Sequence, residues 1–389
     1  MLKPNPAWYT PTHEDFRAAV RRFVANEIAP HAAEWDEDET FPRELYEKAA
    51  AIGLLGLGFP ERFGGTPDAD PFHHLIASEE LARCGSGGIV ASLMSHSIGA
   101  PPILFAGRPE LQERVLPQII AGTKIAALAV TEPGGGSDVA ALRTSARREG
   151  DHYIVNGEKT FITSGMRADY YTVAVRTEPE AQGAAGISLL LIERDAPGFS
   201  RTPLKKMGWW ASDTAHLRFE GCRVPAANLL GEEGKGFRLI MRNFNMERFN
   251  LAAGAWGFAQ VCHEDALAWA QERRTFGKRL VEHQVVAHKL VDMATQLAAT
   301  RAMLEDTAWR LAGPHQQGGE LVAQLCMLKN LATRTMQFCA DAAVQTLGGM
   351  GYMRGTRVER IYRDVKVNMI GGGAEEVMKD LAARQLGYT

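Results

Sequence analysis

Apolar residues recur at helical spacing through the first third of the chain. Between His13 and Ala29 they stand at positions 16, 19, 20, 23 and 24, which predicts an amphipathic helix with one buried face. Similar patterns, bounded by proline or glycine, predict further helices over 41–52, 72–83, 89–104 and 109–120. Turn-forming residues at 60–70 predict a loop between two of these helices. We therefore expect a helical N-terminal region over residues 1–124.

The pattern changes near Ile125 to short β-branched or aromatic runs separated by turn residues. These runs predict strands at 125–131, 152–155, 170–176, 187–193 and 216–220. The pair Asn156-Gly157 stands between two such runs and predicts a hairpin turn. Residues 125–233 are therefore expected to form an antiparallel β domain.

Helical spacing returns after Gly236 and continues to the end of the chain. No proline interrupts 236–274, and apolar residues three, four or seven apart predict a second long helix over 282–311. A third helix is expected over 320–347, and a fourth begins near Ala374. Long helices with short connections predict an antiparallel bundle over residues 234–389.

Composition narrows the class of protein. A chain of 389 residues is too long for one core, so two or three domains are expected. The net charge of −3 gives no sign of a nucleic-acid or anionic-membrane partner. The first ten residues contain prolines where a signal peptide needs an apolar run, and no uninterrupted apolar stretch is long enough for a transmembrane helix. The five cysteines form no C-x-x-C pair and the histidines do not cluster, so we expect no disulfide framework, no metal site and a cytoplasmic location.

A glycine-rich loop, AVTEPGGGSD at 129–138, follows the first predicted strand. Its glycines would let a ligand approach the backbone and would leave amides free to bind it. Taken alone, such a loop is more often a plain surface turn. Three further motifs follow in order: YIVNGEKTFITSG at 153–165, ERRTFGK at 272–278 and QTLGGMGY at 345–352.

Together these motifs resemble the acyl-CoA dehydrogenase family over nearly the whole chain, with Gly355 departing from the usual acidic or amide residue. The resemblance implies an N-terminal α domain, a central β domain and a C-terminal four-helix bundle. It also implies an FAD enzyme that removes hydrogen from Cα and Cβ of a fatty or branched-chain acyl-CoA. The implied partners are electron-transferring flavoprotein, as electron acceptor, and further copies of the chain in a homotetramer or dimer.

The resemblance assigns residues to the cofactor and to CoA. Phe161 would form a wall beside the flavin ring, and the hydroxyl of Thr163 would lie near flavin N5, where it would stabilise incoming charge. Ser137 would contact CoA. The remaining cofactor positions are Leu128, Val130 and Thr131 along the ring, Ala374 and Glu376 near it, and Arg273, Phe276, Gln284, Gln345, Gly348 and Gly349 at the pyrophosphate and adenosine, some of them from a neighbouring subunit. Without the motifs, Phe161 would be read as a core aromatic and Arg273 as a solvated helix end.

The catalytic base is the main departure from the family pattern. Many members carry it as a glutamate in a Tyr-Glu-Gly-Thr motif, but the matching stretch here is IGGGAEE at 370–376, with Gly372 in the glutamate's place. A branch that includes isovaleryl and long-chain types carries it on the first long bundle helix, before an arginine. The sequence NMER at 245–248 stands there, so Glu247 is the expected base. Glu375 and Glu376 are rivals, and a surface ion pair is the commoner role of a helical glutamate.

The neighbours of these residues also receive roles from the resemblance. Arg248 would contact the CoA moiety, and Asn245 would hydrogen-bond it. The amide of Gly372 would donate to the thioester oxygen, helped by the bend that Gly371 and its other glycine neighbour allow. The missing side chain at 372 would leave room near Cα and Cβ. Two alternatives to a dehydrogenase remain open on this fold, a flavin oxidase or monooxygenase and a non-catalytic flavoprotein that binds DNA.

Overall fold

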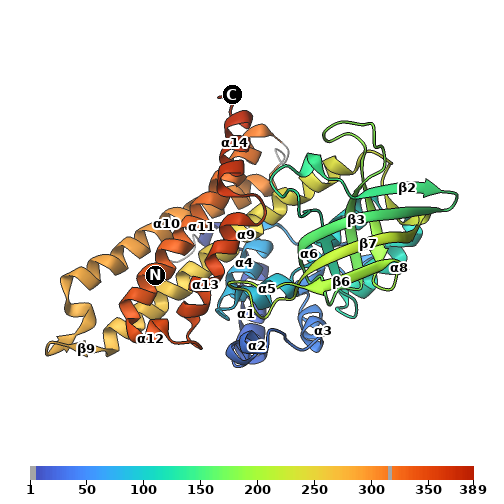
Figure 1. Cartoon of the computed structure of the whole chain (residues 1–389). Coiled ribbons are helices and arrows are strands. Elements are labelled where there is room, and N and C mark those ends of the chain that lie inside the picture. Colours follow the sequence, from blue (N-terminus) through green and yellow to red (C-terminus); the bar gives the residue numbers. More distant parts are fainter. Residues whose placement is uncertain (1–5, 314–317) are drawn as a thin grey trace.

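The fold class expected from the sequence is confirmed (Figure 1). The computed structural model describes residues 6–313 and 318–389, which form an N-terminal helical region, a central β sheet and a set of long C-terminal helices. The expectation of no signal peptide rests partly on residues 1–5, which lie outside the described residues.

Short helices make up the N-terminal region. They are α1 (Pro11–Phe23), α2 (Ala32–Glu37), α3 (Glu44–Ala51), α4 (Pro71–Ala82), α5 (Gly87–Leu93), α6 (His96–Gly99), α7 (Pro101–Ala106) and α8 (Pro109–Ile120). The single helix expected over 89–104 is in fact three helices. Prolines open α7, and because proline has no amide hydrogen and restricts the residue before it, the preceding helix ends there.

The central region is one sheet with a mixed strand pattern. Its strands are β1 (Ala126–Ala129), β2 (Ser145–Glu149), β3 (His152–Thr163), β4 (Tyr170–Arg176), β5 (Ile187–Glu193), β6 (Phe199–Pro203), β7 (Thr214–Pro225) and β8 (Leu229–Leu230), ordered β6-β7-β3-β2-β4-β5-β8 with β1 beside β4. Most strand pairs are antiparallel, as expected for this domain, but β1 pairs with β4 in parallel, and so does β2 at one residue pair. The β2–β3 hairpin lies between β1 and β4 in sequence and provides the long connection that parallel pairing needs.

The hairpin predicted at Asn156-Gly157 is wrong. Both residues lie inside β3, where the pairing with β7 shifts register between Val155 and Gly157. Gly157 has φ +139°, and a Cβ on it would lie 2.7 Å from Thr144 Cα, so only glycine fits this bulge. The turn that joins β2 to β3 lies instead at residues 150–151, next to the Glu149–His152 pair.

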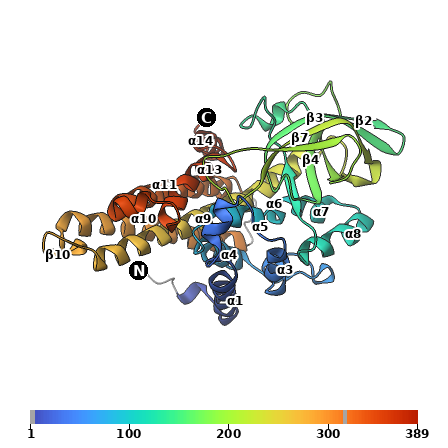
Figure 2. The ribbon, with the colours of Figure 1, turned by 60° about the horizontal axis from the view of Figure 1, so that its bottom comes forward.

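Long helices form the C-terminal region. They are α9 (Gly236–Glu272), α10 (Gln284–Ala312), α11 (Gly319–Leu347), α13 (Arg357–Ile370) and α14 (Glu375–Gln385), with the short α12 (Gly349–Tyr352) and the small hairpin β9 (Arg274–Thr275) and β10 (Lys278–Arg279). Helix α11 is central and packs against α9, α10, α13 and α14. Figure 2 shows the long helices extending away from the sheet, with β10 at their far tip.

Two further expectations concern membrane spans and cysteines. Among the described residues, no single helix is long and apolar enough to cross a membrane, although Gly87–Leu93 and His96–Ala106, bent by 42°, pass that test of length and composition as a pair. All five cysteines are buried and free.

Candidate active site

Glu247 lies on α9, about three turns from the start of the helix. Gly236 lets that start pack tightly on β5, because a Cβ on Gly236 would lie 2.7 Å from the carbonyl carbon of Ser188. Although Glu247 as a residue is only half-buried, its Oε2 is shielded from solvent and accepts no hydrogen bond from the described residues. Burial raises the pKa of Glu247 to about 7, while the charges of Arg248 and Lys329 oppose that rise.

Gly372 faces the same carboxyl group from the loop between α13 and α14. A Cβ on Gly372 would lie 3.8 Å from Glu247 Oε1, so glutamates at 247 and 372 would enter one space from two different elements. The same Cβ would lie 2.5 Å from Cδ1 of Leu251, one turn beyond Glu247 on α9. A side chain at 372 would therefore have to displace Leu251, which occupies part of the space that glycine leaves. Room near Cα and Cβ of the substrate stays a prediction.

Arg248 connects Glu247's helix to this loop. Its guanidinium is buried, and Nη1 donates to Asn245 Oδ1 at 3.1 Å. Its Nε donates to the carbonyl oxygen of Gly372 at 3.4 Å. Gly371 ends α13, with its N–H bonded to the carbonyl of Val367 at 2.7 Å. The structure thus brings together Glu247, Gly372 and the residues of NMER and the glycine loop that the resemblance assigned to CoA, but not Ser137, which lies at the glycine-rich loop after β1.

The two rival glutamates are placed less favourably. Glu375 pairs with Arg334 and with Lys379, the latter at 2.9 Å. These contacts, with Arg334 first, lower the pKa of Glu375 to about 2. Glu376 is exposed at the start of α14, and Ala374 directly precedes that helix without a side-chain cap. A carboxylate held by two cations is a weak base, so Glu247 is the best-placed base in this group.

The predicted flavin face lies on β1, β3 and the segment after β1. The N–H of Thr160 donates to the carbonyl of Thr131 at 2.9 Å and joins the two segments. Phe161 is 70% exposed and has φ +60°, at the irregularity of β3 between Lys159 and Ile162. An exposed aromatic in a left-handed conformation is a feature that proteins retain at functional sites. Thr163, half-buried, ends the same strand, and Leu128 and Val130 lie on and just after β1.

A buried ion pair that the sequence did not reveal supports this face. Nζ of Lys159 lies 2.8 Å from Glu132 Oε1 and donates to the carbonyl of Val130 at 2.9 Å. Burial lowers the pKa of Lys159 to about 8, while Glu132 opposes that shift. Glu132 also accepts backbone hydrogen bonds from Arg143 and Thr144. Both charged residues lie within the sequence motifs. They are 27 residues apart, however, and no feature of the sequence indicates that they form an ion pair.

The predicted pyrophosphate and adenosine residues lie elsewhere. Figure 1 places β9 and α12 at the end of the bundle remote from β2 and β3, and Figure 2 agrees for β10. Phe276 is 96% exposed in the β9–β10 turn. The other residues at this end are also exposed: Arg273, Gln284, Gln345, Gly348 and Gly349. One copy of the chain therefore does not bring this group to Phe161 and Thr131.

Comparison with known proteins agrees with this architecture. Three domain descriptions match the chain in order: "Acyl-CoA dehydrogenase, N-terminal domain" at 10–123, "middle domain" at 127–222 and "C-terminal domain" at 234–387. The long-chain specific mitochondrial acyl-CoA dehydrogenase of Sus scrofa is 39% identical over 380 residues, which cover 97% of this chain and 87% of the relative.

The chain belongs to the acyl-CoA dehydrogenase family.

The resemblance stated from the motifs is thus confirmed, and with it an oxidoreductase that acts on acyl-CoA. Solved structures of the family superpose closely. An acyl-CoA dehydrogenase from Geobacillus kaustophilus is 39% identical with a TM-score of 0.93, covering 97% of this chain and 98% of its own. A glutaryl-CoA dehydrogenase from Mycobacterium smegmatis, solved in complex with FADH2, is 26% identical with a TM-score of 0.91, covering 98% and 96%.

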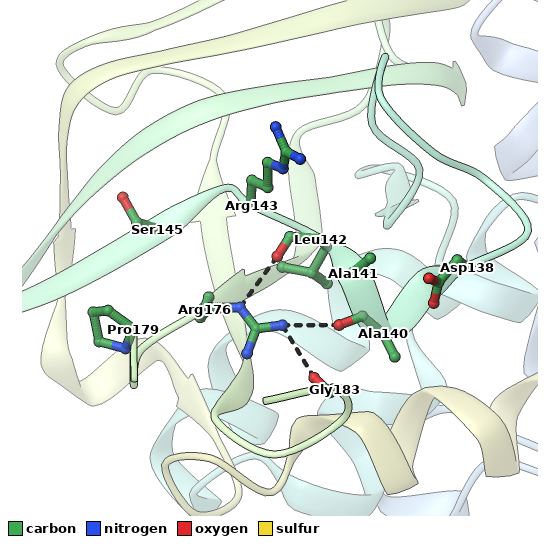
Figure 3. A pocket seen from close by; sticks show the side chains of 9 residues that line it. All are labelled: Asp138, Ala140, Ala141, Leu142, Arg143, Ser145, Arg176, Pro179 and Gly183. Atoms are coloured by element: carbon green, nitrogen blue, oxygen red, sulfur yellow. Dashed lines mark hydrogen bonds between the residues drawn. The ribbon is translucent and has the colours of Figure 1, made fainter. Parts of the chain in front are cut away.

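In this family member, a cavity of about 510 Å³ lies beside the glycine-rich loop rather than at Glu247 (Figure 3). Asp138 lines it, next to the exposed Ser137. Arg176 crosses its floor, but its guanidinium donates to five backbone carbonyls, including those of Leu142 and Gly183. An arginine bound in this way shapes the loops and has no donor to spare for a ligand.

One group of side chains in this family member has the composition of a metal site. Among the described residues, His13, Asp70 and His73 gather their ligand atoms within 4.8 Å. Each already caps a helix: Asp70 accepts from the N–H of Phe72 and of His73 at the start of α4, and His13 Nδ1 accepts from the N–H of Thr10 at the start of α1. Capping accounts for the cluster.

Proposed function

We propose that this family member is an FAD-dependent dehydrogenase that converts a fatty or branched-chain acyl-CoA to the trans-2-enoyl-CoA. The single observation that carries the proposal is the Glu247 carboxyl group. It has a shielded oxygen without a partner among the described residues, it faces the position of Gly372, and its pKa lies near neutrality. A buried carboxyl group without a partner is unfavourable for folding, and such groups occur at functional sites.

In this proposal Glu247 removes the proton from Cα of the acyl group. The N–H of Gly372 donates no hydrogen bond within the described residues, and it would donate to the thioester oxygen. That bond would strengthen as negative charge develops on the oxygen during proton removal. Arg248, already bound to Asn245 and to the loop, would hold the CoA side of the site in place. Bound FAD would supply, at N5, the acceptor for the hydride that leaves Cβ.

The side chains of the predicted flavin face suit a planar ring. Phe161 offers an exposed aromatic surface, and Thr131 and Thr163 place hydroxyl groups on the segments beside it. The buried Lys159–Glu132 pair holds the backbone of that face, which would let its amides meet the ring edge without rearrangement. The relative from M. smegmatis that was solved with FADH2 supports a flavin here.

The remote position of Arg273 and Phe276 supports an assembly. An FAD that lies along Phe161 could meet these residues only if a second copy supplied them, so we propose a homotetramer, with a dimer as the smaller alternative. We propose electron-transferring flavoprotein as the electron acceptor, as the family resemblance implies.

The alternatives are less well supported by the same site. Oxygen-using members of this fold, the flavin oxidases and monooxygenases, often lack a carboxylate at either base position, whereas this chain carries Glu247. A DNA-binding flavoprotein would need a basic surface or tail, and the net charge of −3 offers no such excess.

Anaerobic titration of the purified protein tests the proposal. The protein should be yellow with bound FAD, and at least one acyl-CoA in a series from isovaleryl-CoA to palmitoyl-CoA should bleach it and yield the trans-2-enoyl-CoA. Free CoA serves as the control and should leave the flavin oxidised. A folded protein that cannot be loaded with FAD, or one whose flavin no acyl-CoA in the series reduces, would contradict the proposal. The rates of flavin reduction across the same series show which acyl chain lengths and branching patterns the protein prefers.

A further inference from the structure

Lys329 is a buried cation close to the candidate base. It lies on α11 with its side chain fully buried, and it forms no ion pair closer than 4 Å with any carboxylate of residues 6–313 and 318–389. Its Nζ donates instead to two backbone carbonyls, that of Met369 at 3.2 Å and that of Gly373 at 2.8 Å. A buried ammonium without a close carboxylate is unfavourable unless several acceptors surround it, so two well-placed carbonyls mark a specific arrangement.

The two carbonyls lie on either side of the active-site loop. Met369 belongs to the last turn of α13, and Gly373 follows Gly372 directly. Gly372 and Gly373 have φ of +66° and +109°, conformations that glycine permits but does not enforce. Something outside the loop must therefore hold it, and the ammonium of Lys329 ties its two ends to α11.

The same cation acts on the base through space. The positive charge of Lys329 lowers the pKa of Glu247, and Glu247 in turn raises the pKa of Lys329, which burial brings down to about 8. The other groups that influence Lys329 are Arg248 on α9, Glu375 on α14 and the thiol of Cys326 on α11. Among these charged groups, Glu247 has the largest effect on the pKa of Lys329.

We propose that Lys329 is a positioning residue for catalysis, and this proposal rests on the proposed function. Its ammonium binds the carbonyls on both sides of Gly371-Gly372. This contact keeps the loop amide and the Glu247 carboxylate in place for proton removal. Lys329 does not touch the reacting atoms in this account. It acts through the loop conformation and through the charge that favours ionised Glu247.

A neutral side chain of similar length tests the charge. In Lys329→Met, the absence of the cation disfavours the ionised form of Glu247. The acidic limb of the pH profile of the flavin-reduction rate should therefore move to higher pH by about one unit. At pH 6 the variant should reduce its flavin about tenfold more slowly than the parent, and the difference should shrink to about threefold or less at pH 9. Lys329→Arg retains the cation, so the acidic limb of its pH profile should lie at the same pH as in the parent.

Asn330→Ala is the matched control for a purely structural role. Asn330 is the next residue on α11, is almost as buried, and donates to the carbonyl of Glu375 at 3.0 Å, just beyond the same loop. Its removal loosens the loop without changing any charge, so it should lower the melting temperature and leave the acidic limb in place. An equal shift of the limb in Asn330→Ala and Lys329→Met would overturn the proposal.

A second measurement does not depend on turnover. Infrared difference titration of the FAD-loaded protein follows the buried carboxyl band, which is assigned by its loss in Glu247→Gln. Its midpoint should rise in Lys329→Met, and an unchanged midpoint would overturn the proposal. If Lys329→Met does not fold, Lys329→Gln undergoes the same test. If no acyl-CoA reduces the parent's flavin, the proposed function fails while the infrared midpoint still decides the role of Lys329.

Discussion

At the scale of single residues, two opposing influences set the chemistry of Glu247. Burial favours the protonated carboxyl group, whereas Arg248 and Lys329 favour the carboxylate, and the pKa settles at about 7. A base with a pKa near the working pH combines a useful fraction of the ionised form with a strong tendency to take a proton. The same carboxyl group on the protein surface would be a much weaker base.

This pKa leads to a prediction about pH. In the proposed mechanism proton removal needs ionised Glu247, so kcat/KM should rise with pH and level off above about 7, where the free enzyme's carboxylate is formed. Below about pH 6 it should fall about tenfold for each pH unit. Steady-state assays with an artificial electron acceptor measure the profile, and a rate that stays flat from pH 5 to pH 8 would argue against this base.

The distance between positions 247 and 372 leads to a second prediction. In Glu247→Gln, adding Gly372→Glu should return a carboxylate to the same space, but Leu251 stands 2.5 Å from the new Cβ. The triple variant with Leu251→Ala should therefore recover more activity than the double variant, by roughly tenfold or more. Left-handed φ at 372 should cost about 1–3 kcal/mol of stability. Flavin reduction rates measure the recovery, and no gain in a triple variant that binds FAD and acyl-CoA would contradict the shared reaction centre.

The sequence could single out Glu247, Arg248 and the glycines at 371–373, but not every side chain that surrounds them. The NMER stretch and the glycines at 371–373 stand in recognisable motifs, so a resemblance transfers their roles. Leu251 and Lys329 stand in no motif of that kind. Each matters because its side chain reaches the loop at 371–373 from a helix that is distant in sequence. Such contacts depend on how helices pack, which periodicity does not specify.

At the scale of elements, a buried cluster of charges ties the N-terminal helices to the bundle. Arg301 on α10 binds Glu79 on α4 and Glu305 on its own helix, each at 2.8 Å, and all three are less than a tenth exposed. Arg17 on α1 also reaches Glu79, at 3.2 Å. The cluster holds α1, α4 and α10 in one arrangement beside the helix that carries Glu247.

Removing the central cation of this cluster should destabilise the fold. Arg301→Met removes the cation that Glu79 and Glu305 share, and leaves Glu79 with Arg17 and Glu305 with the hydroxyl of Tyr9. The loss of this buried cation should lower the free energy of unfolding by about 3–5 kcal/mol. Arg310→Met removes a half-exposed pair with Asp306 on the same helix and should cost less than about 1 kcal/mol. Urea denaturation of both FAD-loaded variants gives the comparison, and equal losses would mean that the cluster has no special role.

Elements with a clear apolar period were predictable, and those without one were not. Helix α13 escaped prediction because half of its buried positions are polar: Arg360, Asp364 and Asn368. Strand β2, with sequence SARRE, has one buried residue and carries no strand pattern. Asn156-Gly157 has the sequence of a turn but serves as a bulge, because β3 continues against β7. In each case long-range packing prevailed over local preference.

At the scale of the whole molecule, the order of N-terminal helices, sheet and helical bundle could be predicted from changes in hydrophobic periodicity along the sequence. The boundaries at 124/125 and 233/234 stay a prediction. The position of the far end of the bundle could not be predicted, because it depends on how a long helix such as α9 projects from the sheet.

The separation of the two predicted FAD regions leads to a prediction about assembly. Arg273→Gln with Phe276→Ser should lower FAD occupancy and shift the protein towards smaller species, although β9, which these residues flank, is remote from β3 in its own chain. Met207→Ser, at an apolar side chain 70% exposed outside the bundle, is the control and should change neither property. Light scattering with flavin absorbance measures both, and a monomer that keeps its FAD would exclude a shared site.

The measurement that bears most directly on the account is anaerobic stopped-flow reduction of the flavin in Glu247→Gln, with an acyl-CoA that reduces the parent. Glutamine keeps the size and most of the hydrogen bonding of glutamate but cannot accept the Cα proton. The account predicts that acyl-CoA still binds and that flavin reduction slows by about 100- to 10,000-fold or more. Reduction at near the parent rate would contradict it and would direct the same substitution to Glu375 and Glu376.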